Sequence, residues 1–453
     1  MSRHKLLIIS YLFPPAGGIA VQRALSMAKY LPDCGFEVHV LTAANAAAPV
    51  YDSGLLRQVP RSVIVHHAMT LEVPFALRHR IWSLIGARPG GSEPAAPYVR
   101  PRRSFPMKVA QRVFCPEPEV VWVPFAKRAA RRIVEQYGIQ CVLVTAPPFS
   151  AFLVGNALKR TFPSLKFVAD FRDEWLTFYI NNNEFQNTDF ARQRAAEIER
   201  ETIEASDLVV AVTDSSLKEI KGRYPSQPPA KFRSVSNGFD PEAFADFEPR
   251  VHGEDAVIVT HVGTVYKNAS PRFYFEALAQ LPEPIRMTFR TRFIGRVVDT
   301  EHEVLSAQGS SVQVLGFMPQ AEALRYMEDT DYLLLTMTDR ISMPGKLYEY
   351  LATGKPILAI SPRGSEVDQM IRNHDIGWCA DPTEPGTVVE MLMKALELAR
   401  RRDGRFRHNR DIARRYERPQ LVAHYAALMR QTIEGGSIDC PGSADIETAR
   451  VAI

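Results

Sequence analysis

Apolar positions in the first half of the chain follow two alternating patterns. Short continuous apolar runs are typical of buried strands, and they alternate with stretches in which apolar residues recur every three or four positions, as in a helix with one buried face. The runs predict strands at 5–10, 36–41, 63–66, 141–144, 167–169, 208–212 and 233–235. The first helical stretch is marked by Val21, Ala24, Leu25, Ala28 and Leu31. Such alternation predicts a parallel sheet covered by helices on both faces.

The same pattern restarts near residue 257. Strands are predicted at 257–262, 288–294, 312–315, 332–336 and 357–360, with helices near 272–281, 321–328, 346–353, 364–373 and 387–400. Between the two patterns, the Pro-, Gly- and acid-containing stretch 241–255 lacks apolar periodicity and predicts a linker. The predicted order is an N-terminal domain (1–240), the linker (241–255), a C-terminal domain (256–410), a terminal helix (411–435) and a mobile tail (436–453). Ligands of open parallel sheets bind beyond the carboxyl ends of the strands, so we expect two α/β domains that face each other across a cleft.

Composition narrows the class of protein. The 453 residues are 46% hydrophobic and 23% charged, close to the globular average, which excludes a disordered chain or a fibre. A net charge of +4 is too small to indicate nucleic-acid binding by the whole chain. The five cysteines have no C-x-x-C spacing and are expected to be reduced thiols in a cytoplasmic protein. No apolar run is long enough to span a membrane, and the run 6–13 leads into a Pro- and Gly-rich loop rather than a signal-peptide cleavage site.

Two motifs of the first half contain residues that are suited to binding a ligand. Gly17 and Gly18 lie between the first strand and its helix, where backbone N–H groups and the helix N-terminus suit a diphosphate or an acceptor hydroxyl. The alternative is a tight turn, since the G-x-G-x-x-G spacing is absent. Asp170, Arg172, Asp173 and Trp175 follow a strand and suit sugar hydroxyls and ring stacking. Their alternative is a salt-bridged helix start with Trp175 as a core residue.

Two further motifs lie in the second half. Gly263, Thr264 and Lys267 follow the first strand of that half, where a glycine, a hydroxyl and a cation suit a leaving phosphate, although Lys267 alone could be a solvated loop residue. The second motif is an S-x-P-G-K sequence that precedes a helix, and its residues are Ser342, Pro344, Gly345, Lys346 and Glu349. A helix N-terminus there suits a phosphate, and Glu349 suits the hydroxyls of a ribose. Gly354 is predicted to end the helix.

These motifs together resemble those of GT-B-fold glycosyltransferases of the large retaining group, GT4-like and of group 1, which includes bacterial surface-polysaccharide transferases. The resemblance runs through both predicted domains. It rests on FPPAGG at 13–18, DFRDEW at 170–175, SNGFD at 236–240, VGTVYK at 262–267, LGFMP at 315–319 and PGKLYEYLATGKPIL at 344–358. The last block is the most specific.

The resemblance implies a UDP- or GDP-linked sugar donor held mainly by the C-terminal domain. Glu349 corresponds to the family glutamate that binds the donor ribose, and Lys267 to the cation that neutralises the phosphates. Arg292 is a second catalytic candidate. Gly17 and Gly18 match the loop that faces the donor phosphates and the acceptor, and the group Asp170, Arg172, Asp173 and Trp175 is assigned to the acceptor.

Two positions depart from the family pattern. Ile341 stands where the first of the usual two glutamates is expected, and Thr264 stands where an arginine often follows the glycine. The backbone at 342–345 is then the candidate for binding the sugar or the diphosphate. No metal or other cofactor is expected, because lysine, amides and helix ends neutralise the diphosphate in this fold. His66, His67 and His261 are weaker acid/base candidates, for which a packed or solvated histidine is the simpler interpretation.

A basic belt, residues 78–112, contains eight Lys and Arg residues against one acid, Glu93, together with several aromatic and aliphatic residues. This composition suits an anionic membrane surface. It is also consistent with a solvated loop. We therefore expect a peripheral protein on the inner face of the cytoplasmic membrane with a lipid-linked saccharide acceptor. The alternatives are a catalytically silent GT-B protein that binds nucleotide sugar or acts as a scaffold, and a nucleotide-sugar epimerase of the same fold.

Overall fold

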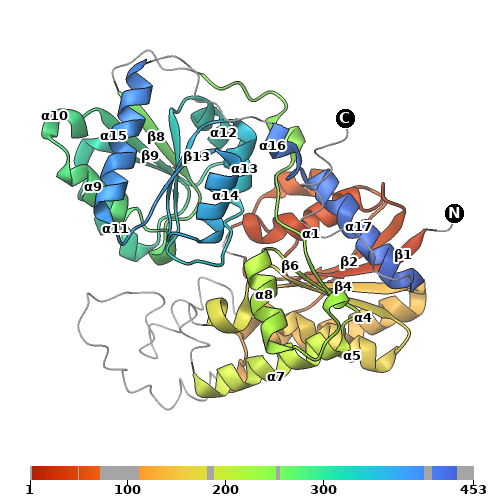
Figure 1. Cartoon of the computed structure of the whole chain (residues 1–453). Helices are drawn as coiled ribbons and strands as arrows, with labels where there is room; N and C mark the ends of the chain where they lie inside the picture. Colours follow the sequence, from red (N-terminus) through yellow and green to blue (C-terminus); the bar gives the residue numbers. More distant parts are fainter. Residues whose placement is uncertain are drawn as a thin grey trace, which may run out of the picture. The chain divides into compact units, whose positions relative to one another are not determined.

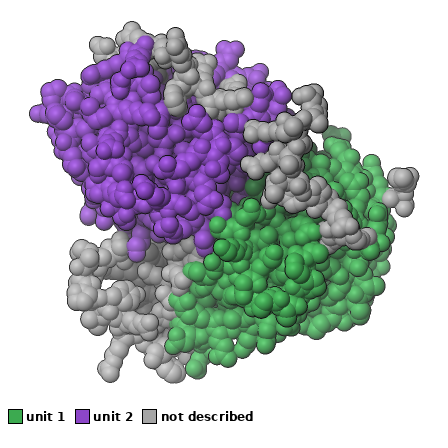
Figure 2. Space-filling model, in the orientation of Figure 1, with its two compact units in different colours: residues 1–89, 98–236, 419–453 green, residues 90–97, 237–418 purple. Residues whose placement is uncertain are grey.

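The computed structural model describes residues 3–48, 50–71, 112–180, 188–250, 256–401 and 411–435. Contacts between Cα atoms divide the chain into two compact units, coloured separately in Figure 2. Unit 1 contains the described residues up to Ser236 and those from Pro419 onward. Unit 2 contains residues 237–418 of the described chain. The chain therefore passes from unit 1 to unit 2 after Ser236 and returns to unit 1 after Arg418.

Unit 1 is built on a seven-stranded parallel sheet in the order β3-β2-β1-β4-β5-β6-β7. Its strands are β1 (His4–Ile9), β2 (Phe36–Ala43), β3 (Ile64–Ala68), β4 (Cys141–Ala146), β5 (Lys166–Phe171), β6 (Leu208–Ala211) and β7 (Phe232–Ser234). Its α-helices are α1 (Ile19–Tyr30), α4 (Val123–Tyr137), α5 (Phe152–Thr161), α7 (Asp189–Ala205), α8 (Asp214–Arg223) and α17 (Arg418–Glu434). The strand order reverses between β1 and β4, as in doubly wound folds.

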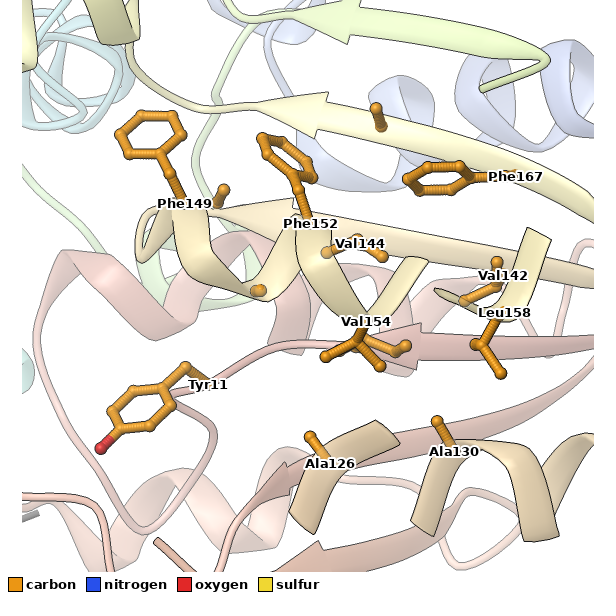
Figure 3. Close-up of a cluster of buried hydrophobic side chains, with 14 of the residues drawn as sticks. Tyr11, Ala126, Ala130, Val142, Val144, Phe149, Phe152, Val154, Leu158 and Phe167 are labelled. Carbon is orange, nitrogen blue, oxygen red and sulfur yellow. The ribbon is translucent and has the colours of Figure 1, made fainter. Parts of the chain in front are cut away.

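Helices cover both faces of this sheet, because successive strand residues point to opposite sides. On one face, strand residues such as Val142 and Val144 pack against α4 and α5 in the cluster drawn in Figure 3. On the other face, Leu6 and Ile8 pack against α1 and α17. Figure 1 shows α17, near the end of the chain, beside α1 and β1. Both faces are covered by helices, which explains the uninterrupted apolar runs in the sequence.

Unit 2 repeats this architecture with a six-stranded parallel sheet in the order β10-β9-β8-β11-β12-β13. Its strands are β8 (Val257–Val262), β9 (Phe289–Ile294), β10 (Val312–Gly316), β11 (Tyr332–Thr336), β12 (Ile357–Ile360) and β13 (Gly377–Ala380). Its α-helices are α9 (Arg272–Gln280), α10 (Glu283–Arg286), α11 (Asp299–Ser306), α12 (Gln320–Glu328), α13 (Lys346–Thr353), α14 (Glu366–His374), α15 (Pro385–Arg401) and α16 (Asp411–Arg414). Helices α9 and α15 cover one face, and α13 and α14 cover the other. The predicted pair of doubly wound α/β domains is confirmed.

The segments that connect the units differ from the sequence-based expectation. The range 241–255 was expected to be a linker, but its described part contains the 3-10 turn η6 (Pro241–Phe244). Phe244 and Phe247 are buried in the core of unit 2, so this stretch is part of a domain. The terminal helix, expected as one element at 411–435, consists of α16 in unit 2 and α17 in unit 1. None of the described helices is long and apolar enough to cross a membrane.

Candidate functional site

The candidate site lies in unit 2, at the carboxyl ends of β8 and β11. The strand order reverses between these two neighbours, which is where doubly wound sheets bind ligands. The loop after β8 leads through Gly263 into the 3-10 turn η7 (Lys267–Ala269). The loop after β11 joins this turn, since Thr338 N donates to Asn268 O over 2.9 Å. The two loops are therefore joined to each other, and the first of them lies close to Lys346 of α13.

Gly263 lets a lysine stem pass close to the backbone. Its φ of 126° lies in the region that favours glycine. A Cβ at this position would lie 3.2 Å from Nζ and 3.3 Å from Cε of Lys346. A larger residue at 263 would therefore displace the Lys346 side chain.

The N-terminus of α13 has no side-chain cap, as is also true of α1, α9 and α12, whereas other helices have one. Thr188, Thr213 and Ser365 accept hydrogen bonds from first-turn amides of α7, α8 and α14. At α13 the N-cap residue is Gly345, and no side-chain hydrogen bond caps the helix. The Leu347 amide already donates to Pro344 O over 3.0 Å and the Tyr348 amide to Gly345 O over 3.2 Å, so this helix end favours an anion chiefly through its partial positive charge. Gly354, with a φ of 72°, follows the last residue of the helix, as the sequence predicts.

Lys346, the first residue of α13, lies against a buried histidine. Lys346 Nζ is 3.1 Å from His261 Nε2, and His261 Nδ1 is 3.1 Å from Leu334 O. A carbonyl oxygen only accepts, so Nδ1 carries the hydrogen and Nε2 accepts from the ammonium. Burial, and then the Lys346 charge, hold the pKa of His261 well below its usual value. Burial lowers the pKa of Lys346 to about 7, although the Glu349 carboxylate opposes this.

Glu349 lies one turn into α13, on the same side as Lys346. Its Oε1 accepts a hydrogen bond from Gln320 Nε2 over 3.1 Å. Burial raises the pKa of Glu349, while the charges of Arg418 and Lys346 and the Gln320 hydrogen bond act in the opposite direction. Arg418 is held in place by a 3.1 Å hydrogen bond from its Nε to Gly238 O. This carboxylate is thus half-buried, oriented and close to two cations.

Other predicted donor-site residues surround this group. Thr264 and Lys267 are exposed on the loop after β8. Ser342 and Pro344 are half-buried in the loop before α13. The Ser342 amide is already occupied, because it donates to Asp339 Oδ1 over 2.7 Å. The expectation that backbone amides at 342–345 bind the donor therefore does not hold for Ser342.

Arg292 is not part of this group. Its Nη1 donates to Asp329 O over 2.8 Å and forms an ion pair with Asp329 Oδ2 at 3.3 Å. Asp329 precedes β11, so the guanidinium is directed to the amino ends of the strands. Because the candidate site lies at the carboxyl ends, the structure argues against the predicted catalytic role of Arg292.

The glycine loop of unit 1 lies between β1 and α1, as predicted. Gly17 N donates to Val50 O over 2.9 Å, so this amide is already hydrogen-bonded. A Cβ on Gly17 would lie 3.1 Å from Val50 Cγ1, which explains why a glycine suits this position. Gly18 is exposed at the start of α1 with a φ of 81°. Of the two glycines, Gly18 is the one open to a ligand.

The predicted acceptor residues are mostly engaged inside unit 1. Asp170 is fully buried and accepts hydrogen bonds from Arg23 Nη2 at 2.8 Å and from Thr145 Oγ1 at 2.7 Å. Arg172 donates to the carbonyls of Ala20 and Pro147. A fully buried carboxylate of this kind cannot also bind sugar hydroxyls.

Trp175 is a core residue, as the packing alternative proposed. It is 0% exposed and stacks on Phe149, with ring centroids 4.4 Å apart and planes 5° from parallel. The structure therefore corrects the acceptor assignment for Trp175, Asp170 and Arg172, because their polar groups or rings face the interior. Asp173 is half-buried.

The candidate histidines do not form one catalytic group. His66 packs beside His39, with Nε2 of His66 3.0 Å from Nδ1 of His39. Burial lowers the pKa of His66, with help from His39 and His67. His261 belongs to the other unit. Its contact with Lys346 was missed because nothing in a local sequence pattern links residues 85 positions apart.

Gln320 and Arg418 were also missed, because only folding brings them to Glu349. The basic belt lies outside the described residues except for Arg112, whose guanidinium carbon is 5.7 Å from the Phe190 ring centroid. The predicted mobile tail, 436–453, also lies outside them.

Two family models match the chain. Residues 256–398 match "Glycosyl transferases group 1", and residues 87–243 match "Glycosyltransferase Family 4". The probable glycosyltransferase WbjE of Pseudomonas aeruginosa is 29% identical over 108 residues, which cover 23% of this chain. That alignment spans 27% of the length of WbjE.

Solved structures extend the likeness to the whole fold. HepE of Anabaena, solved in complex with UDP and glucose, is similar with a TM-score of 0.63 at 14% identity, covering 94% of this chain and all of HepE. WaaG, a glycosyltransferase involved in lipopolysaccharide biosynthesis, is similar with a TM-score of 0.57 at 15% identity, covering 95% of this chain and 98% of WaaG. These similarities and the two sheets assign the chain to the GT-B fold. The two matched regions, which together span most of both units, belong to the group 1 and family 4 glycosyltransferases.

Proposed function

We propose that this glycosyltransferase takes a sugar from a nucleotide-sugar donor whose diphosphate binds at the N-terminus of α13. The observation that carries the proposal is this uncapped helix end, which has Lys346 at its first position and Glu349 one turn later. It lies beside the glycine loop at the carboxyl end of β8, where Gly263 allows close approach.

Each residue has a distinct role in this proposal. The ammonium groups of Lys346 and Lys267 neutralise the negative charge that grows on the diphosphate as the sugar–phosphate bond breaks. Glu349 accepts hydrogen bonds from the ribose hydroxyls, and Gln320 orients its carboxylate. Gly18 lies at the N-terminus of α1, which suits acceptor or phosphate binding. Lysines, amides and helix ends take the place of a metal ion.

The ligands of one structural neighbour support a UDP-linked donor. HepE has been solved with UDP-glucose as well as with UDP and glucose. WaaG, a second neighbour, is involved in lipopolysaccharide biosynthesis. We extend the proposal to transfer with retention of configuration, to a lipid-linked saccharide acceptor of cell-surface polysaccharide or glycolipid synthesis, and to a peripheral position on the inner face of the cytoplasmic membrane. The basic belt, residues 78–112, supports the membrane part by its charge.

Release of nucleotide from UDP- and GDP-sugars, with and without lipid-linked acceptor, tests the activity. We expect Lys267→Ala to lower kcat/KM about 100-fold, the usual scale for losing one group that stabilises transition-state charge. Glu349→Ala removes hydrogen bonds to the ribose and should lower kcat/KM about tenfold or more. Lys218→Ala, at an exposed lysine of α8, is the matched control and should leave the rate unchanged. If both site variants turn over at the wild-type rate, the assignment of Lys267 and Glu349 to the donor site is wrong.

A catalytically silent nucleotide-sugar-binding protein is the second candidate, and it is favoured by Ile341 at the position of the family's first glutamate. Thermal-shift titration with the same donors separates the two functions. A donor that raises the melting temperature without any turnover in the presence of acceptors would identify the silent protein. If the chain is the proposed enzyme, the anomeric proton of the product, observed by NMR, should keep the configuration of the donor.

A further inference from the structure

The side chain of Lys346 contacts a buried histidine, His261, and diphosphate binding alone does not explain why a histidine lies there. His261 is 1% exposed and is fixed by Leu334 O on one side and by the Lys346 ammonium on the other. Tyr350 OH also reaches Leu334 O, at 3.3 Å, so this carbonyl is held in place. The Leu334 contact makes Nδ1 the nitrogen that carries the hydrogen, so Nε2 faces Lys346, and the Thr264 backbone also contacts the imidazole.

We propose that His261 is a positioning residue that holds the Lys346 ammonium at the N-terminus of α13, and that Lys346 takes up a proton when a nucleoside diphosphate binds there. The inference rests on the proposed function, which brings the diphosphate to this helix end. The inference gives His261 a role although it touches no substrate. It also adds the uptake of one proton by Lys346 when the nucleotide binds.

The groups that surround Lys346 explain why it would take up a proton on nucleotide binding. From β8 it meets the neutral imidazole of His261, and from its own helix it meets the Glu349 carboxylate, which is itself close to Arg418. Within the described residues, no salt bridge joins Lys346 to a carboxylate. Burial lowers the pKa of Lys346 to about 7, so a large fraction is neutral above neutral pH. A bound diphosphate favours the charged form and draws a proton from solvent.

Calorimetric titration with UDP and with GDP at pH 8 measures this proton. Two buffers with different ionisation enthalpies give the number of protons taken up per nucleotide. The secondary phosphate of a nucleotide ionises near pH 6, so it contributes little at pH 8. We expect uptake approaching one proton, and an affinity that falls up to about tenfold per pH unit above neutrality. Lys346→Arg keeps the positive charge and should bind with no uptake.

Two substitutions test the histidine. His261→Asn places an amide donor near Leu334 O and leaves no acceptor that reaches Lys346, so UDP affinity should fall about tenfold, the scale of one hydrogen bond to a charged group. His261→Gln places an acceptor near the position of Nε2 and should recover most of that loss. His302→Asn, at an exposed position of α11, is the matched control. Thermal unfolding checks that each variant is folded.

The outcomes separate this inference from the proposed function. Proton uptake by the wild type, together with none by Lys346→Arg, supports the inference even if the His261 variants do not fold. Tight UDP or GDP binding without uptake, unchanged by His261→Asn, overturns it and leaves the proposed function standing. Failure of the wild type to bind either nucleotide overturns both.

Discussion

Asp170 shows how a single buried carboxylate organises unit 1. It lies at the carboxyl end of β5 and accepts hydrogen bonds from Arg23 of α1, Thr145 of β4 and, at 3.3 Å, the Tyr425 hydroxyl of α17. Arg23 also donates to Ser236 O over 3.1 Å, at the point where the chain leaves unit 1. A buried charge is tolerated only with such partners. Asp170, from the motif that suggested sugar binding, therefore holds four segments of unit 1 together through buried hydrogen bonds.

Trp175 offers a direct test of this structural interpretation. Replacing it with alanine should lower the free energy of unfolding by about 3–5 kcal/mol, because a fully buried ring that stacks on Phe149 leaves a cavity. Chemical denaturation followed by circular dichroism measures the change, and Phe190→Ala, at an exposed ring of α7, is the control. Unchanged stability with a raised acceptor KM would restore the acceptor role.

Individual residues are the scale at which sequence reasoning is weakest. A motif such as DFRDEW contains the same residue types whether they face a ligand or the core. The direction of each side chain depends on partners such as Arg23, which lies 147 positions before Asp170. The S-x-P-G-K motif was more informative, because Gly345 and Gly354 mark the two ends of α13 through local backbone conformation.

At the scale of elements, a cluster of buried charges joins three helical segments of unit 1. Arg223 of α8 pairs with Glu174, just before the π-helical turn η4 (Trp175–Tyr179), at 2.6 Å. It also pairs with Glu199 of α7 at 2.8 Å. One arginine thus serves two buried carboxylates. Burial raises the pKa of Glu199 to about 7, with Glu174 adding to the effect and Arg223 opposing it.

This cluster predicts a pH dependence of stability. The folded state binds the Glu199 proton more tightly than the unfolded state, so the contribution of Glu199 is largest below about pH 4.5, the ordinary value, and is lost as the pH rises to about 7. Within that window the free energy of unfolding should fall by about 1.4 kcal/mol per pH unit from this group. Denaturation at several pH values should show a flatter profile for Glu199→Gln than for the wild type.

The matched control for this experiment is Glu204→Gln, an exposed carboxylate on the same helix. Its pH profile should follow that of the wild type. If Glu199→Gln leaves the slope between pH 4.5 and 7 unchanged, the buried carboxylate is not the source of the pH dependence.

Elements were predicted well where burial on both sides produced a clear pattern. The apolar runs of β4 and β11 are continuous because helices cover both faces of each sheet. The stretch before β8 differs from the predicted linker, because its structure depends on isolated aromatic residues. Phe244 and Phe247 bury their rings without any periodic neighbours to reveal it.

At the scale of the whole molecule, the segment that enters unit 2 and the segment that leaves it are hydrogen-bonded to each other inside unit 2. Phe239 N donates to Tyr416 O over 3.1 Å, and Arg418 N donates to Phe239 O over 2.9 Å. After the second crossing, α17 returns to unit 1 and buries Val422 and Met429 against the sheet. Sequence alone placed a helix here but could not assign it to a unit, because that choice depends on a face of β1 more than 400 residues earlier.

Removal of α17 should therefore damage unit 1 selectively. A chain ending at residue 418 exposes the face formed by Leu6, Ile8 and Val38, so limited proteolysis should cut unit 1 faster while unit 2 stays resistant. A chain ending after Gly435 retains α17 and is the control. Equal protection of unit 1 in both truncations would show that α17 is not needed for its core.

The return of α17 to unit 1 also determines which unit can finish folding first during synthesis. Unit 2 is contiguous from residue 237 to residue 418 within the described chain, and domains generally fold as units during synthesis. Unit 1 is begun first but lacks one covering helix until the residues after 418 have been made. The later-made unit can thus be complete while the earlier one still exposes an apolar face. During that interval the nascent chain exposes the apolar face of unit 1 that α17 later covers.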